Sequence, residues 1–165
     1  MPEDYAVAAT RHFRDGALLE ESRRVANADQ LFGFAAECAI KSALVELPGF
    51  LAGGTLAPAY HKHVNQLWDF VPLQGIQRRY RGLVVVLKGL QQPFADWSTD
   101  QRYGPDGVVT DKAIGRHLQA AARVLGSVTR KLVAALGNLQ EYGPKDAKTP
   151  KELKGYHYMI GMPYF

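Results

Sequence analysis

The segment from Ala26 to Leu47 constrains the fold more than any other part of this sequence. It places apolar residues on almost every side of the helix that it would form, for example throughout residues 31–36. A helix that is apolar all round must be covered by other helices, so it belongs at the centre of a bundle. Asn27 or Asp29 can cap its start, and Pro48-Gly49 is expected to end it.

Three other segments repeat apolar residues at steps of three and four, which is the period of an amphipathic helix. They are Asp4–Arg24, Gly75–Phe94 and Asp111–Gln140. Thr110 or Asp111 can cap the start of the last of them. A shorter helix is predicted over His63–Val71 and ends at a proline. Residues 51–60 and 96–109 are predicted to be loops, and no segment gives a convincing strand signal. The sequence therefore predicts an all-α protein, an up-and-down bundle of four long helices and one short helix.

The length of 165 residues suits one domain of ordinary size. We expect the bundle to cover residues 1–140, with residues 141–165 as a basic, Tyr-rich tail that packs on it or extends from it. No window approaches the roughly 18 uninterrupted apolar residues of a membrane span. The acidic start lacks the apolar region of a secretory signal. These features predict a cytoplasmic protein that does not associate with membranes.

Metal and cofactor sites are not predicted. Cys38 is the single cysteine, which excludes an intramolecular disulfide framework and a Cys-rich zinc site. Inside an apolar helix, its thiol is expected to be buried and inert. His61 and His63 lack a third ligand at a fixed spacing, so we expect them to cap or precede the short helix. Gly-rich phosphate loops and nucleophile elbows are absent.

The charge is distributed unevenly along the chain. Residues 1–75 contain 6 Lys/Arg and 9 Asp/Glu, whereas residues 76–165 contain 14 and 7, for a net charge of +4 overall. The second part therefore attracts polyanions, of which nucleic acid is the commonest. A basic surface that only increases solubility is the alternative.

Three groups of residues are candidates for a functional site. Glu37 and Lys41 stand four apart on the central helix, either as a structural ion pair or as the lining of a cleft. Arg116, Arg123 and Arg130 are seven apart on the last helix. They form a row that could follow a phosphate backbone or simply face solvent.

The third group is the loop that contains Trp97 and the pair Arg102-Tyr103. The aromatic rings could dock this loop on the bundle. Alternatively, Arg102 binds a phosphate while a ring stacks on a base.

The order of these features resembles that of HEPN domains (higher eukaryotes and prokaryotes nucleotide-binding). Residues 34–44, Phe-Ala-Ala-Glu-Cys-Ala-Ile-Lys-Ser-Ala-Leu, resemble the family's second helix, in which an aromatic-Ala-x-Glu-Cys-x-Leu-Lys-x-x-Leu pattern recurs. Residues 61–68 are similar to its His-led short segment. The stretch from Trp97 to Arg102-Tyr103 resembles its Trp-x(n)-Arg-Tyr element. The resemblance covers roughly residues 5–138.

The resemblance implies a helical bundle that is usually a homodimer. Many HEPN domains are metal-independent ribonucleases of toxin–antitoxin or defence systems, and others bind nucleotides or a partner such as a minimal nucleotidyltransferase. The nuclease members carry Arg-x(4–6)-His. Arg102 matches the arginine, but Gly107, Val108 and Val109 stand in the following stretch. The next histidine, His117, is fifteen residues beyond Arg102, so binding without cleavage is the expected outcome.

We therefore expect a HEPN-like protein that binds RNA or a nucleotide. If it cleaves RNA, the candidate catalytic residues are Arg102 and His117. The candidate binding residues are Glu37, Lys41, Arg102, Tyr103, Arg116, Arg123 and Arg130. The alternative function is a non-catalytic module that pairs with a nucleotidyltransferase-like or other acidic protein.

Overall fold

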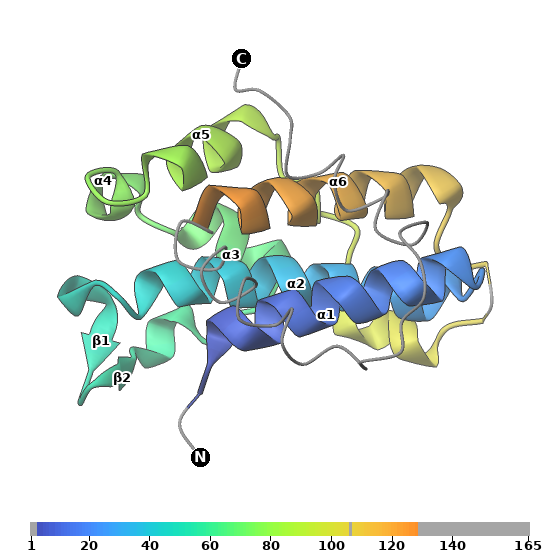
Figure 1. Ribbon diagram of the computed structural model, residues 1–165, viewed down its shortest axis with the longest axis horizontal. Coiled ribbons are helices and arrows are strands. Elements are labelled where there is room, and N and C mark those ends of the chain that lie inside the picture. Colours follow the sequence, from blue (N-terminus) through green and yellow to red (C-terminus); the bar gives the residue numbers. More distant parts are fainter. Residues whose placement is uncertain (1–2, 106, 129–165) are drawn as a thin grey trace, which may run out of the picture. The chain divides into compact units, whose positions relative to one another are not determined.

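The computed structural model describes residues 3–105 and 107–128. Over these ranges it contains three long helices. They are α1 (Tyr5–Glu21), α2 (Val25–Leu44) and α6 (Asp111–Val128). In Figure 1, α1 runs opposite to α2, while α6 runs beside α2 in the same direction. The all-α prediction is confirmed for these residues. The chain divides into residues 1–128 and 129–165, and the predicted tail, the boundary at residue 140 and Arg130 lie outside the described residues.

Short elements connect α2 to α6. The helices among them are α3 (Val64–Phe70), α4 (Leu73–Ile76) and α5 (Arg81–Gly89), and the 3-10 turns are η1 (Pro48–Phe50), η2 (Pro58–Tyr60) and η3 (Thr99–Tyr103). Strands β1 (Leu51–Ala52) and β2 (Thr55–Leu56) form a small antiparallel hairpin. Gly53 and Gly54 make its turn with φ of 60° and 82°, which glycine adopts without steric cost. The prediction of a loop without a strand over residues 51–60 is therefore wrong.

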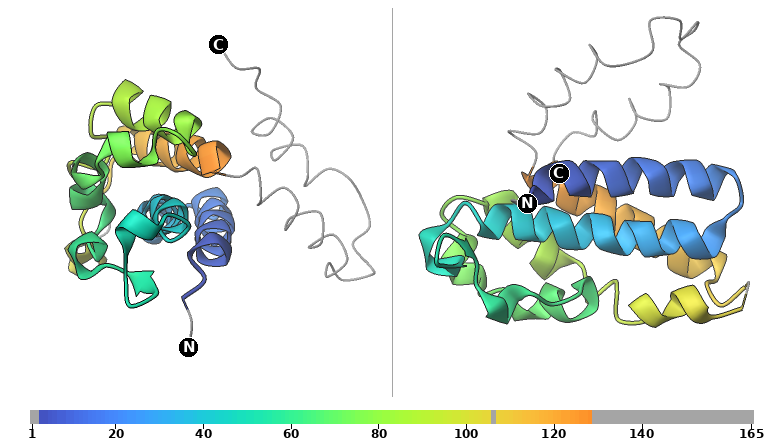
Figure 2. Two further views of the ribbon diagram at one scale, coloured as in Figure 1. Left: turned by 90° about the vertical axis from the view of Figure 1, so that its left-hand side faces the viewer. Right: turned by 90° about the horizontal axis from the view of Figure 1, so that it is seen from below.

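The central position predicted for residues 26–47 is confirmed. Helix α2 packs on α1, on α6, on α3 and on η3, and Figure 2 (right) shows it between α1 and the layer that contains α3 and η3. Its bounds differ from the prediction at both ends. It begins at Val25 after Arg24 and ends at Leu44, ahead of Pro48. Asp29 consequently lies one turn inside the helix instead of capping it.

The prediction of one long helix over Gly75–Phe94 is wrong. The structure divides it into α4 and α5, with a break at residues 77–80, so the fourth long helix of the expected bundle is absent. Helix α5 also ends before the predicted residue. The indole of Trp68 donates a hydrogen bond to the carbonyl of Leu90 at 3.3 Å, an oxygen that a continuous helix would offer to the amide of Phe94. A tertiary contact thus replaces a helical one.

The last helix starts where the sequence predicts. The amide of Ala113 donates to Oγ1 of Thr110 at 3.1 Å, so Thr110 caps α6 as expected. Over the described ranges, no helix combines the length and the apolar character needed to cross a bilayer.

Candidate functional site

A buried ion pair on α2 holds a half-exposed histidine from the start of α3. Nζ of Lys41 lies 2.8 Å from Oε1 of Glu37, and both residues are buried. The other oxygen of Glu37, Oε2, lies 3.1 Å from Nδ1 of His63. The side chain of His63 remains 54% exposed. Of the two interpretations of Glu37 and Lys41, the structure shows the ion pair, and Glu37 also contacts an exposed imidazole.

Cys38 and His61, which are close to this group in the sequence, have different surroundings. Burial raises the pKa of the Cys38 thiol to about 11, and the nearby Glu37 adds to the effect, so the thiol is a poor nucleophile at neutral pH. Nε2 of His61 contacts the carbonyl of Leu56 at 3.0 Å. Among the described residues, no group of three or more His, Cys, Asp or Glu side chains is arranged to hold a metal ion.

His117 lies in a second buried cluster and is fully enclosed. Its Nδ1 is 2.6 Å from Oδ1 of Asp29, and its Nε2 is 3.1 Å from Oδ1 of Asp96. Both ring nitrogens of His117 therefore face carboxyl oxygens, one from Asp29 and one from Asp96. Phe94 stacks on it at 4.9 Å between centroids. With both nitrogens engaged, His117 connects α2, α6 and the loop between α5 and α6.

Arg116 belongs to the same cluster. Its Nε donates to the carbonyl of Pro93 at 2.9 Å, and its Nη2 lies 2.6 Å from Oδ1 of Asp96. The guanidinium is therefore occupied within the protein. Of the predicted arginine row, Arg123 is exposed and Arg130 lies outside the described residues. The row is not brought together as a free cationic ridge over the part of α6 that the structure describes.

The loop from Asp96 to Tyr103 is anchored on α2 through Trp97. The indole is 1% exposed, and its Nε1 donates to the carbonyl of Asp29 at 3.0 Å. Gly33 leaves the space for this ring, because a Cβ there would lie 2.0 Å from Cε2 of Trp97. Gln30 adds a hydrogen bond to the carbonyl of Ser98 at 2.7 Å. Docking of this loop by Trp97, one of the two predicted roles, is what the structure shows.

Arg102 and Tyr103 stand at the end of the anchored loop and face solvent. The guanidinium carbon of Arg102 lies 4.7 Å from the ring centroid of Tyr103, and Tyr103 is 77% exposed. No carboxylate among the described residues pairs with Arg102. A cation and a ring held next to each other on a fixed loop can bind a phosphate and a planar base together.

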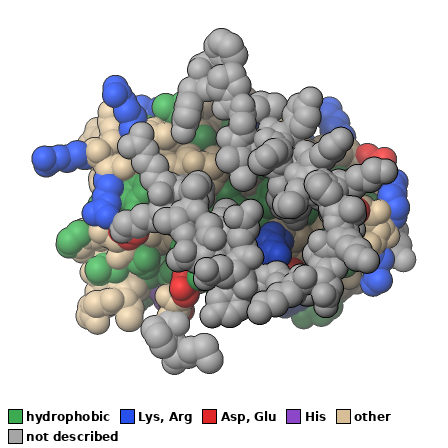
Figure 3. All heavy atoms as spheres, viewed as in Figure 1, with side chains coloured by type: hydrophobic (Ala, Val, Ile, Leu, Met, Phe, Trp, Pro, Cys, Tyr) green, Lys and Arg blue, Asp and Glu red, His purple; other side chains and the backbone are tan. Residues whose placement is uncertain are grey.

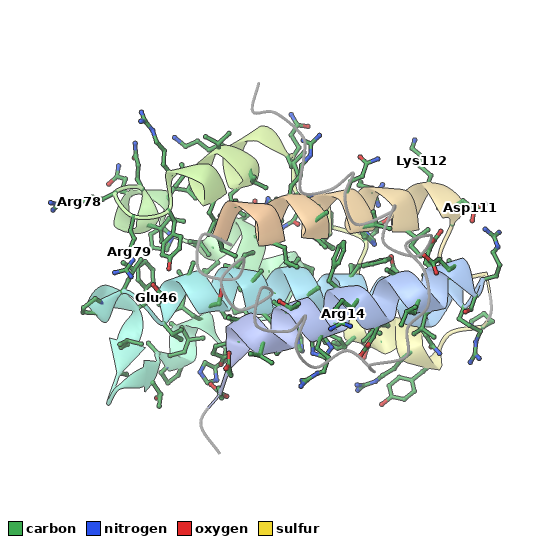
Figure 4. The ribbon with its side chains drawn as sticks, viewed as in Figure 1. Arg14, Glu46, Arg78, Arg79, Asp111 and Lys112 are labelled. Atoms are coloured by element: carbon green, nitrogen blue, oxygen red, sulfur yellow. The ribbon has the colours of Figure 1, made fainter. Side chains whose placement is uncertain are left out.

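Other cations are spread over the surface. Figure 4 shows Arg78 and Lys112 pointing away from the protein, whereas Arg79 reaches Glu46 through an ion pair of 2.6 Å. Where the surface is visible in Figure 3, Lys and Arg side chains occupy separate places instead of one continuous patch.

Three residues of these clusters were not predicted as site residues from the sequence: Asp29, Asp96 and His63, which contacts the Glu37 carboxylate. Asp29 carries the same signal as Glu37, an acidic side chain within an apolar helix. For Glu37 the partner Lys41 is one turn away and visible in the sequence. For Asp29 the partner is His117, 88 residues along the chain, and no local pattern connects the two.

The pKa of Asp96 predicts how this cluster responds to acid. Partial burial would raise this pKa, but hydrogen bonds from Arg116 and His117 outweigh burial and hold it below its usual value. A lowered pKa contributes stability that is present above about pH 4 and is lost as the pH falls through the native value. We expect Asp96→Asn to be less stable than wild type at pH 7 and the difference to shrink toward pH 2. Urea unfolding at pH 7 and at pH 2 measures the difference in the free energy of unfolding between the two proteins. A difference that is the same at both pH values would contradict this prediction.

In comparisons with protein-family models, with curated proteins and with solved structures, nothing matches this chain. The HEPN resemblance therefore stays a hypothesis.

Proposed function

We propose that this chain is a HEPN-like domain that binds single-stranded RNA or nucleotides, with Arg102 and Tyr103 as the contact residues. The observation that carries this proposal is the stacked, exposed Arg102–Tyr103 pair at the end of a loop fixed by Trp97. The homodimer and the membership of a toxin–antitoxin or defence system implied by the resemblance are part of the same proposal.

Three physical features support binding at this pair. First, an exposed tyrosine ring offers a face on which any base can stack, which suits single strands whose bases are not paired. Second, Arg102 is free of carboxylates among the described residues, so its guanidinium can bind a phosphate. Third, the buried anchor of Trp97 limits the entropy lost when the loop binds a ligand.

The proposal is tested by titrating a fluorescently labelled single-stranded RNA with the full chain and following anisotropy. Base–aromatic stacking contributes about 1–3 kcal/mol per base, so we expect Tyr103→Ala to raise Kd by roughly 5- to 150-fold. Arg102→Gln should also weaken binding, and it should flatten the slope of log K against log salt by about 0.7 for one lost phosphate contact.

The matched control is Arg14→Gln, which removes an exposed arginine of α1 (Figure 4) that has no ion pair in the described part of the chain. We expect the control to bind like wild type apart from a small salt-dependent change. Competition by adenosine monophosphate separates nucleotide binding from binding that needs a strand. If both loop variants bind as tightly as the control, the Arg102–Tyr103 pair is not the contact site.

A further inference from the structure

Lys41, Glu37 and His63 form a chain of contacts that ends at an accessible imidazole nitrogen. Glu37 is 7% exposed and uses one oxygen for Lys41 and the other for His63. The carboxylate can only accept from Nδ1 of His63, so this nitrogen carries the proton. In the neutral ring the lone pair is then on Nε2. Among the described residues, Nε2 has no hydrogen-bond partner.

A buried carboxylate that fixes one nitrogen of a histidine and leaves the other free is the arrangement of a general base. The carboxylate sets the tautomer and stabilises the imidazolium that forms when Nε2 takes a proton. The ammonium of Lys41 balances the negative charge of Glu37 in its buried position. The ring of Trp97 lies edge-to-face with that of His63, at 6.3 Å between centroids.

The other histidines of the described chain lack one of these features. His117 is fully buried, and both of its nitrogens face carboxylates. His61 contacts a backbone carbonyl and has no carboxylate. His12 lies beside the ring of Phe34 at 5.8 Å, and burial lowers its pKa. His63 alone among the described histidines combines a carboxylate on one nitrogen with a half-exposed ring.

A general base at this position has to deprotonate a nucleophile, and that nucleophile has to belong to the substrate. No Ser, Thr or Cys side chain is hydrogen-bonded to His63 within the described ranges, and the pKa of the Cys38 thiol is raised to about 11 by burial. RNA carries its own nucleophile, the 2′-hydroxyl next to each phosphodiester. Trp97 connects the two places, since its ring adjoins His63 and its loop carries Arg102 and Tyr103.

We infer that His63 is a catalytic base for RNA cleavage, with Glu37 as its positioning residue. Nε2 takes the proton of a 2′-hydroxyl, the 2′-oxygen forms a bond to phosphorus, and the bond from phosphorus to the 5′-oxygen breaks. The departing 5′-oxygen takes a proton from water, and His63 returns its proton to solvent. The products are a 2′,3′-cyclic phosphate and a 5′-hydroxyl. This inference rests on the proposed RNA binding.

The test incubates a labelled single-stranded RNA with the full chain at pH 8 in EDTA, which suppresses metal-dependent contaminating nucleases. We expect slow cleavage to a cyclic phosphate end and none of an all-deoxy strand of the same sequence. A general base contributes about 10²- to 10⁴-fold, so His63→Ala should lose at least a hundredfold in rate. His61→Ala, an exposed histidine two residues away, should keep the wild-type rate.

RNA anisotropy measured on the same variants separates this inference from the proposed function. Unchanged RNA affinity with lost cleavage in His63→Ala supports the catalytic role. RNA that is bound but never cut, or cut equally by His63→Ala, overturns the inference and leaves the binding proposal standing. If the wild-type protein cuts RNA but Tyr103→Ala and Arg102→Gln bind it as tightly as wild type, the proposed contact site is overturned. The assignment of His63 as the base then still stands.

The positioning role of Glu37 is tested by a separate measurement, the tautomer of His63. Nitrogen-15 NMR of the histidine rings at pH 8 should show His63 protonated at Nδ1 with the lone pair on Nε2. Glu37→Gln should shift this tautomer balance toward the Nε2-protonated form, while the helical circular dichroism spectrum confirms that the variant is folded. A His63 ring that carries its proton on Nε2 in the wild-type protein overturns the positioning role.

Discussion

Replacing His117 by leucine is expected to lower the free energy of unfolding by about 3 to 5 kcal/mol, the cost of breaking a buried ion pair by removing one partner. The substitution leaves Asp29, which is completely buried, without the imidazole nitrogen 2.6 Å away. It also removes the hydrogen bond to Asp96 and the ring that stacks on Phe94. Urea unfolding followed by circular dichroism measures the change.

The control for this prediction is His61→Leu, because His61 is exposed and contacts only a backbone carbonyl by its side chain. We expect that variant to stay within about 0.5 kcal/mol of wild type, as surface substitutions usually do. Adding Asp29→Asn to His117→Leu should recover part of the loss, since the uncompensated charge is then gone. Equal stability of His117→Leu and His61→Leu would show that the cluster does not hold the helices together.

Gly33→Ala is expected to destabilise the protein by about 3 kcal/mol, at the upper end of the usual cost of overpacking a core. The new Cβ would lie 2.0 Å from Cε2 of Trp97, closer than any relaxation of a rigid helix can absorb. The indole would have to leave its site, losing its burial and its hydrogen bond to Asp29. Because the loop of Arg102 and Tyr103 is anchored by this ring, RNA affinity should fall as well.

The matched control is Gly115→Ala in α6, where a Cβ meets nothing within 4 Å. There the exchange should stabilise the protein by about 0.5–1 kcal/mol, the ordinary gain of alanine over glycine inside a helix. The mechanism is checked in a Trp97→Ala background, in which Gly33→Ala should cost almost nothing. A similar cost in both backgrounds would mean that the clash with Trp97 is not the cause.

The sequence by itself determined the features that depend on neighbours along the chain. The all-round apolar character of residues 26–47 predicted a central helix because every side of it had to be covered, and α2 is that helix. The contact between Glu37 and Lys41 followed from a spacing of one helical turn. The start of α6 followed from the capping oxygen of Thr110. Each of these rests on interactions within about four residues.

Only the tertiary structure decided which residues meet across long separations. The end of α5, ahead of the predicted Phe94, comes with a hydrogen bond from Trp68, 22 residues before Leu90. The partner of His63 is Glu37, 26 residues earlier, and the partner of His117 is Asp29, 88 residues earlier. Hydrophobic periodicity says which face of a helix is buried but not which polar side chain from another element faces it. The chemistry of both histidines depends on those distant carboxylates, so it was decided by the packing of α2 against α3 and α6.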